Sequence, residues 1–190
     1  MRPIYFLSDA HLGSRAIPHG RMHERRLVNF LDSIKHKAAA IYMLGDMFDF
    51  WYEYKMVVPR GYTRFLGKIS ELTDLGVEVH FFIGNHDIWC SDYLEKECGV
   101  ILHRQPLTTE IYGREFYLAH GDGLGDPDKK FKFLRAMFHN RFLQKGILSY
   151  QENQHAQFRG IWHTGCGKYN HVYPKELHKH LLLCLFYYRL

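Results

Sequence analysis

The stretch Ile4-Tyr5-Phe6-Leu7-Ser8-Asp9-Ala10-His11 decides the fold, because a short apolar run ends there in a polar cluster. The same arrangement returns in Ile41-Tyr42-Met43-Leu44-Gly45-Asp46 and in Val79-His80-Phe81-Phe82-Ile83-Gly84-Asn85. Continuous rather than alternating hydrophobicity is typical of strands that are buried on both faces. We therefore expect three central strands, each followed at its carboxyl end by polar side chains.

Two amphipathic segments, residues 21–37 and 62–75, separate these strands and are predicted to be helices. Strands that alternate with helices form crossover units, so the predicted fold class is α/β, with a mixed, largely parallel central sheet flanked by helices. A short helix at 91–98, a strand at 101–102 and a hairpin within 107–119 are expected to follow.

Composition limits the class of protein. A chain of 190 residues with 46% hydrophobic and 24% charged residues can form one compact domain with an appendage, but not two large domains or a disordered chain. The 4 cysteines form no CxxC pair, which favours reduced thiols in the cytoplasm. No apolar run approaches the roughly 20 residues of a spanning helix, so any membrane contact is expected to be peripheral.

Four polar clusters stand at the ends of predicted strands, at 9–11, 45–49, 84–87 and 120–122. Ligands bind at the carboxyl ends of the strands in open α/β sheets, so these clusters are expected to converge. Residues two apart on an extended segment point the same way, so Asp9 and His11 of the first cluster are expected to face one ion. Any one cluster is also compatible with a turn or a helix cap, whereas all four together favour a site for Mn, Fe or Zn.

The motifs D-x-H, G-D-x-x-D, G-N-H-D and H-G-D resemble those of the calcineurin-like metallophosphoesterases, over about residues 1–145. Within that family the likeness is closest to the diphosphatases that cleave UDP-2,3-diacylglucosamine. The resemblance implies a metallophosphoesterase-type layered fold and a metal-dependent hydrolase that releases UMP and 2,3-diacylglucosamine 1-phosphate in lipid A biosynthesis. The alternatives are a phosphodiesterase for another phosphoester or nucleotide, and an inactive protein that only binds metal or ligand.

The resemblance also implies a site with two divalent metal ions, of which Mn²⁺ is the expected kind. Asp9 and His11 are expected to bind one ion, Asn85 and His120 the other, and Asp46 both. Two cations bridged by a carboxylate can lower the pKa of a shared water and hold phosphate oxygens for in-line attack.

Two further residues have implied roles at the substrate. His86 is expected to be the catalytic residue that stabilises charge on the phosphate, and Asp122 is expected to bind the substrate. The expected partners are a nucleotide-lipid and the cytoplasmic surface of the inner membrane, to which the protein would be peripheral. Nucleic acid is not an expected partner, and the oligomeric state stays open.

The predicted organisation is a metallophosphoesterase core at 1–126, a basic, amphipathic, lid-like helix at 127–145 and a tail at 146–190. Residues 128–190 hold 11 Lys and Arg against 3 Asp and Glu, whereas residues 1–127 hold 14 against 17. The closing G-H-x-H motif of the family, which supplies further metal ligands, does not occur in this sequence. His163 is the best substitute in the tail, which reads either as divergent or as the product of a truncated or shifted reading frame.

Overall fold

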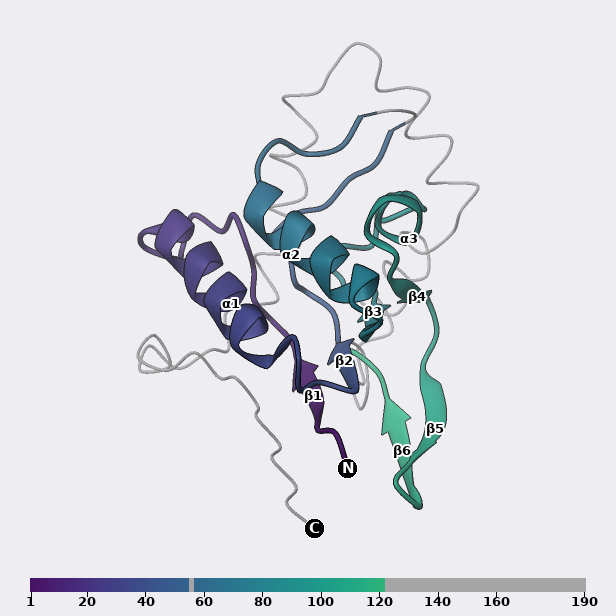
Figure 1. Cartoon of the computed structure of the whole chain (residues 1–190). Helices are drawn as coiled ribbons and strands as arrows, with labels where there is room; N and C mark the ends of the chain where they lie inside the picture. Colours follow the sequence, from purple (N-terminus) through teal and green to yellow (C-terminus); the bar gives the residue numbers. More distant parts are fainter. Residues whose placement is uncertain (55–56, 122–190) are drawn as a thin grey trace, which may run out of the picture. The chain divides into compact units, whose positions relative to one another are not determined.

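In the computed structural model, residues 1–54 and 57–121 are described (Figure 1). One sheet contains β1 (Ile4–Leu7), β2 (Ala40–Met43), β3 (Glu78–Phe82) and β4 (Ile101–His103). The connecting helices are α1 (Gly20–Ile34), α2 (Thr63–Asp74) and α3 (Tyr93–Cys98). A separate hairpin contains β5 (Leu107–Ile111) and β6 (Arg114–Leu118). The lid-like helix and the tail that the sequence predicts lie outside the described residues.

The four-stranded sheet is parallel and has the order β1-β2-β3-β4. Each crossover between neighbouring strands contains one helix, which confirms the α/β prediction and the largely parallel sheet. Because all four strands run in one direction, the segments that follow β1, β2 and β3 leave from the same edge of the sheet. The polar clusters at 9–11, 45–49 and 84–87 therefore lie at this edge.

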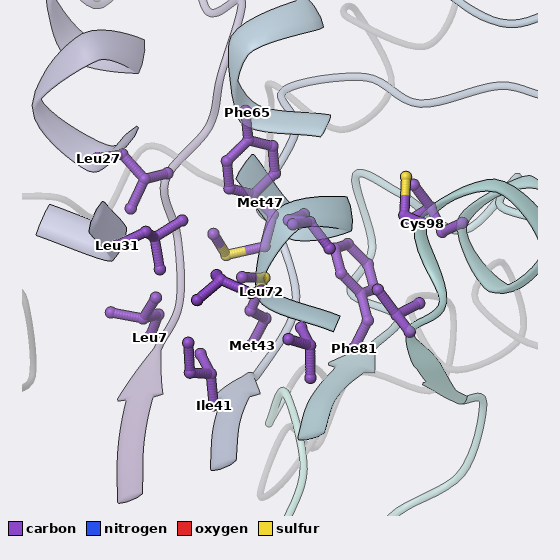
Figure 2. Close-up of a cluster of buried hydrophobic side chains, with 14 of the residues drawn as sticks. Leu7, Leu27, Leu31, Ile41, Met43, Met47, Phe65, Leu72, Phe81 and Cys98 are labelled. Atoms are coloured by element: carbon purple, nitrogen blue, oxygen red, sulfur yellow. The ribbon is translucent and has the colours of Figure 1, made fainter. Parts of the chain in front are cut away.

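Both faces of the central strands β2 and β3 are buried, as their continuous apolar runs predict. Helices α1 and α2 lie side by side on one face (Figure 1). Figure 2 shows Leu27 and Leu31 of α1 and Phe65 of α2 in one buried cluster with Ile41 and Met43 of β2. Fully burying one such side chain contributes about 1.5–3 kcal/mol, so this layer is a main source of stability for the described part of the chain.

The hairpin packs against the opposite face of the sheet. Tyr42 and Phe82 share a second buried cluster there with Ile111 and Leu118. The hairpin turn places Tyr112 at φ 53° and the following glycine at φ 77°, the left-handed conformations of a two-residue turn. This arrangement confirms the predicted hairpin and sets the position of the segment that follows β6.

The first helix is shorter than the predicted 21–37, because it ends at Ile34. The amides of Lys37 and Ala38 both lie 2.9 Å from the carbonyl oxygen of Ile34, which closes a tight turn. Ala38 is fully buried, and the chain turns here to enter β2. Among residues 1–54 and 57–121 there is no helix with the length and apolar character needed to cross a bilayer.

Candidate metal centre

The polar clusters converge at the carboxyl edge of the parallel sheet. His11, Asp46 and His86 offer donor atoms that all lie within 4.8 Å of one another, and so do Asp9, Asp46 and His120. Asp46 belongs to both groups, as a residue that bridges two ions must. Of the predicted site residues, Asp122 and the substitute ligand His163 lie outside the described part of the chain.

Asp46 is a buried carboxylate at the middle of the site, with 4% of its surface exposed. Its Oδ2 atom lies 3.4 Å from Nε2 of His120 and 3.9 Å from Nε2 of His11. Its Oδ1 atom accepts a hydrogen bond of 2.9 Å from the backbone amide of His86. Burial alone would raise the pKa of Asp46, but the hydrogen bond and charge of His120 hold it below its ordinary value.

His120 has a defined orientation. Its Nδ1 atom lies 2.9 Å from the carbonyl oxygen of Leu44, so Nδ1 is the nitrogen that donates. Its Nε2 atom lies 3.2 Å from Oδ1 of Asn85 and faces the carboxylate of Asp46. Burial opposes the charged imidazole, yet the carboxylate of Asp46 raises the pKa of His120 to about 9.

The donor set around His120 fits a cation. When the imidazole is neutral, its Nε2 lone pair faces the oxygen atoms of Asn85 and Asp46, and three electron-rich atoms then converge. A proton or a metal ion between these atoms makes that convergence favourable. Because imidazole, carboxylate and amide oxygen donors are combined, the set suits Mn, Fe or Zn better than Ca or Mg alone.

Asp9 and His11 come together by a route that differs from the expected one. An extended segment was predicted to aim both side chains the same way, but their φ angles are 54° and 42°, in the left-handed region. The amides of these residues bond to the carbonyl oxygens of Gly45 and Asp46, which fixes the path of the loop. The segment is therefore not extended as predicted, and yet Oδ1 of Asp9 lies 3.8 Å from Nε2 of His11.

The loop after β1 has a further support from α1. The Nε2 atom of His23 lies 2.6 Å from the carbonyl oxygen of Ala10, the residue between Asp9 and His11 in the sequence. Left-handed conformations cost a non-glycine residue of the order of 1–2 kcal/mol, and they persist where surrounding bonds impose them. These bonds therefore hold Asp9 and His11 in a strained but convergent arrangement.

His86 lies against His11, with ring centroids 4.8 Å apart and an interplanar angle of 86°. Its Nδ1 atom is 2.7 Å from the carbonyl oxygen of Asp49, and this bond sets the orientation of the ring. The carboxylate of Asp49 lies 3.9 Å from Nδ1 of His11. The second acid of G-D-x-x-D thus contacts one predicted ligand and its backbone orients the predicted catalytic residue.

Two glycines allow the close approach of these segments. Gly45 has φ +96°, and a Cβ atom there would lie 2.7 Å from Nδ1 of His120. A Cβ atom on Gly84 would lie 2.2 Å from Oδ1 of Asp46. Glycine is therefore required by contact and by backbone conformation at Gly45, and by contact at Gly84.

Two buried acids beside the site, Asp87 and Glu53, have no predicted role from the sequence motifs. Asp87 is fully buried, and its carboxylate accepts hydrogen bonds from the amides of Gly84, at 2.5 Å, and Met47, at 3.1 Å. Burial and the nearby Asp46 raise the pKa of Asp87 to about 7. Glu53 is the other, and the signal for it is an acid within the aromatic run Trp51-Tyr52-Glu53-Tyr54.

Comparison with known proteins agrees with this geometry. A family model described as calcineurin-like phosphoesterase matches residues 2–181. A UDP-2,3-diacylglucosamine hydrolase from Porphyromonas gingivalis is 60% identical over 119 residues, which are 63% of this chain and 45% of the relative. A protein of the same name from Neisseria gonorrhoeae is 34% identical over 148 residues, 78% of this chain and 60% of the relative. The chain thus spans about half the length of these curated relatives.

Among solved structures, a protein of unknown function from Aquifex aeolicus aligns with 71% of this chain, at 18% identity and a TM-score of 0.41.

Proposed function

Because the chain belongs to the calcineurin-like phosphoesterase family, we propose that it hydrolyses a phosphoester with the help of two divalent cations held at the carboxyl edge of the sheet. The observation that carries this proposal is the position of Asp46, which is shared by two convergent groups of donor atoms. A shared, buried carboxylate is suited to hold two cations at once.

The proposed ligands are Asp9 and His11 for one ion and Asn85 and His120 for the other, with Asp46 common to both. Mn²⁺ is the ion to test first, because the donors combine nitrogen and oxygen atoms. When bound, the ions would supply Lewis acidity toward phosphate oxygens and a lowered pKa for a shared water.

His86 would act on the phosphate itself. The bond between its Nδ1 atom and the carbonyl oxygen of Asp49 fixes the ring, and a fixed donor stabilises developing charge without having to reorganise. Asp122, which follows His120 in the H-G-D motif and lies outside the described residues, is proposed to contact the substrate.

The proposed substrate is UDP-2,3-diacylglucosamine, cleaved at its pyrophosphate to UMP and 2,3-diacylglucosamine 1-phosphate. The names of the relatives from P. gingivalis and N. gonorrhoeae support this choice. A substrate with two acyl chains resides in a bilayer, so we propose that the protein works as a peripheral protein on the cytoplasmic surface of the inner membrane. Residues 1–126 are proposed as the metallophosphoesterase core and residues 127–145 as a lid-like helix.

The test is release of UMP from UDP-2,3-diacylglucosamine in mixed micelles, with the full chain and added Mn²⁺. Asp46→Ala should lose at least a hundredfold in kcat, whereas the control Asp74→Asn, at an exposed position on α2, should keep full activity. Full activity in Asp46→Ala would rule out the proposed site. Faster turnover of a soluble nucleotide or diester than of the lipid would instead favour a phosphodiesterase of another specificity.

A second function, binding of metal or ligand without turnover, is favoured by one observation. The sequence has no G-H-x-H motif, which supplies further metal ligands in the family. Metal stoichiometry separates the two functions. Two tightly held Mn²⁺ ions per chain support the hydrolase, whereas one ion or none, together with absent turnover, supports the binding protein.

A further inference from the structure

Glu53 is a buried acid that stands apart from the proposed metal ligands. Its residue surface is 8% exposed, and its carboxylate has four hydrogen-bond donors around it. The Oε1 atom accepts from Nε1 of Trp51 at 2.8 Å and from Sγ of Cys90 at 3.3 Å. The Oε2 atom accepts from the backbone amides of Asp92 at 2.9 Å and Tyr93 at 3.1 Å.

The four donors offset the free-energy cost of burying this carboxylate. A buried carboxylate is costly unless its oxygen atoms are fully hydrogen-bonded, and bonds to a charged acceptor are about twice as strong as neutral ones. Three of the donors of Glu53 belong to the segment 90–93, and one belongs to its own segment. The carboxylate is therefore a strong link between two stretches of chain that are far apart in the sequence.

The two linked segments, 46–53 and 84–93, both lead back to the metal centre. They run side by side, with the amide of Trp51 3.3 Å from the carbonyl oxygen of His86 and the amide of Glu53 3.4 Å from that of Trp89. At one end, Asp46 and the carbonyl oxygen of Asp49 bond to His86. At the other end, the link is the carboxylate of Glu53.

We propose that Glu53 is a positioning residue, which locks the segment 84–93 against the segment 46–53 and thereby holds the ring of His86 at the metal centre. Because the backbone bonds near Trp51 and Trp89 are long, the carboxylate is the strongest tie at its end of the pair. Without it, the segment 84–93 can pivot about its bonds to Asp46, and the bond between Nδ1 of His86 and the carbonyl oxygen of Asp49 loosens.

This inference rests on the proposed role of His86, but its test does not depend on turnover. In Glu53→Gln the side chain keeps its length, but an NH₂ group replaces one carboxylate oxygen. This group cannot accept the hydrogen bonds of the donors that face it. The metal-free full chain is studied at pH 7.5 by NMR of the imidazole nitrogens. Wild type should show His86 with the proton on Nδ1 alone, and Glu53→Gln should show both tautomers. Because the proposed ligand Asn85 lies on the same segment as His86, titration with Mn²⁺, followed by the EPR signal of the free ion, should show about tenfold weaker binding in the variant.

The matched control is Thr73→Val, which acts on the opposite end of α3. The hydroxyl of Thr73 donates to the carbonyl oxygen of Cys98 at 2.8 Å, so its loss weakens the anchoring of the same helix away from the metal centre. This variant should unfold at a lower temperature but keep the wild-type tautomer of His86 and wild-type affinity for Mn²⁺. If Glu53→Gln behaves as Thr73→Val does in both measurements, the proposal is wrong and Glu53 is a stabilising residue only.

A second variant covers the case in which Glu53→Gln does not fold. Glu53→Asp keeps the charge but is one methylene shorter, so it should keep the bond to Trp51 and lose those to the amides of α3. It should show the same mixed tautomers of His86. If both variants fail to fold while Thr73→Val folds, Glu53 is needed for the fold rather than for the position of His86, and the proposal fails. Absence of hydrolysis in wild type would overturn the proposed function and leave these readouts intact.

Discussion

The Nδ1 atom of His120 lies 2.9 Å from the carbonyl oxygen of Leu44, across 76 positions of sequence. Leu44 directly precedes Gly45 and Asp46, so the segment that supplies the shared carboxylate also fixes the tautomer of His120. In metal sites, a hydrogen bond from the far ring nitrogen orients a histidine ligand and raises its basicity. His120 is therefore oriented for a cation by the fold itself.

This orientation predicts that protons and Mn²⁺ compete for His120. The folded pKa of His120 is about 9, above the unfolded value of 6.5. The stability that its proton contributes is thus fully present below pH 6.5 and is lost as the pH rises through 9. We expect the Tm of the metal-free chain to decline between pH 6.5 and 8.5, and Mn²⁺ to raise the Tm more at pH 8.5, where it displaces a proton more easily.

Differential scanning fluorimetry at both pH values, with and without Mn²⁺, checks this expectation. In His120→Asn the gain in Tm with Mn²⁺ should shrink at both pH values, because one donor is weakened. An unchanged gain in that variant would contradict a role for His120 in holding the ion.

A pair of glycine substitutions tests how closely the segments approach at the site. Gly45→Ala should destabilise the fold by about 2 kcal/mol or more, because φ is +96° and the new Cβ atom would lie 2.7 Å from His120. Gly67→Ala is the control, since Gly67 lies within α2 with nothing within 4 Å of its added Cβ atom. It should stabilise the fold by about 0.5–1 kcal/mol. Urea unfolding measures both, and equal effects would refute the steric account.

The ion pairs of Asp32 on the surface between α1 and α2 are expected to contribute to Tm in a way that depends on salt. Asp32 lies 2.8 Å from Nζ of Lys35 and 2.7 Å from Nζ of Lys68, and these bonds lower the pKa of Asp32 to about 2. A depressed carboxyl pKa contributes stability that is present above about pH 4 and is lost as the pH falls toward 2. Because the group is exposed, Asp32→Asn should lower Tm only slightly at neutral pH.

The decrease in Tm should disappear in 1 M NaCl, where screening acts over about 3 Å. Thermal melts of both proteins at low and high salt provide the measurement. A decrease that persists at high salt would mean that Asp32 acts through packing rather than through charge.

Much of the fold is predictable from the sequence because its cause is local. The runs ending at Leu7, Leu44 and Ile83 are apolar without alternation, which is typical of strands buried on both faces. The amphipathic helical segments between them favour parallel strands joined by helical crossovers. The convergence of Asp9, Asp46 and Asn85 follows from parallel topology, because they follow β1, β2 and β3, whereas His120 follows β6 of the antiparallel hairpin.

The remaining features depend on contacts between distant segments. Asp9 and His11 adopt left-handed conformations because their amides bond to the segment after β2, and no property of D-x-H itself shows that. Glu53 stands in the sequence as one acid among aromatic residues, and its role depends on the nearness of the segment that begins α3. Asp122 and the tail lie outside the described residues, so their predicted roles remain predictions.

The pair His80 and His103 predicts a loss of stability in mild acid. Nδ1 of His80 lies 2.9 Å from Nε2 of His103, and the ring of His80 stacks on Tyr42 with centroids 4.3 Å apart. Burial lowers the pKa of His80 more than Glu78, 3.6 Å from its Nε2 atom, raises it. Burial and the neighbouring imidazole lower the pKa of His103.

Both imidazoles are therefore neutral in the fold at a pH where the unfolded chain already binds protons. The stability that they contribute is present above pH 6.5 and is lost as the pH falls below it. His80→Phe should keep the stacking on Tyr42 but no longer titrate, so its Tm should fall less than that of wild type between pH 7.5 and 5.5. The raised pKa values of His11 and His120 change stability in the opposite direction, but they do so in both proteins. The difference in Tm between wild type and His80→Phe therefore reports on the His80 and His103 pair. Equal decreases in Tm would show that protonation of His80 does not oppose folding.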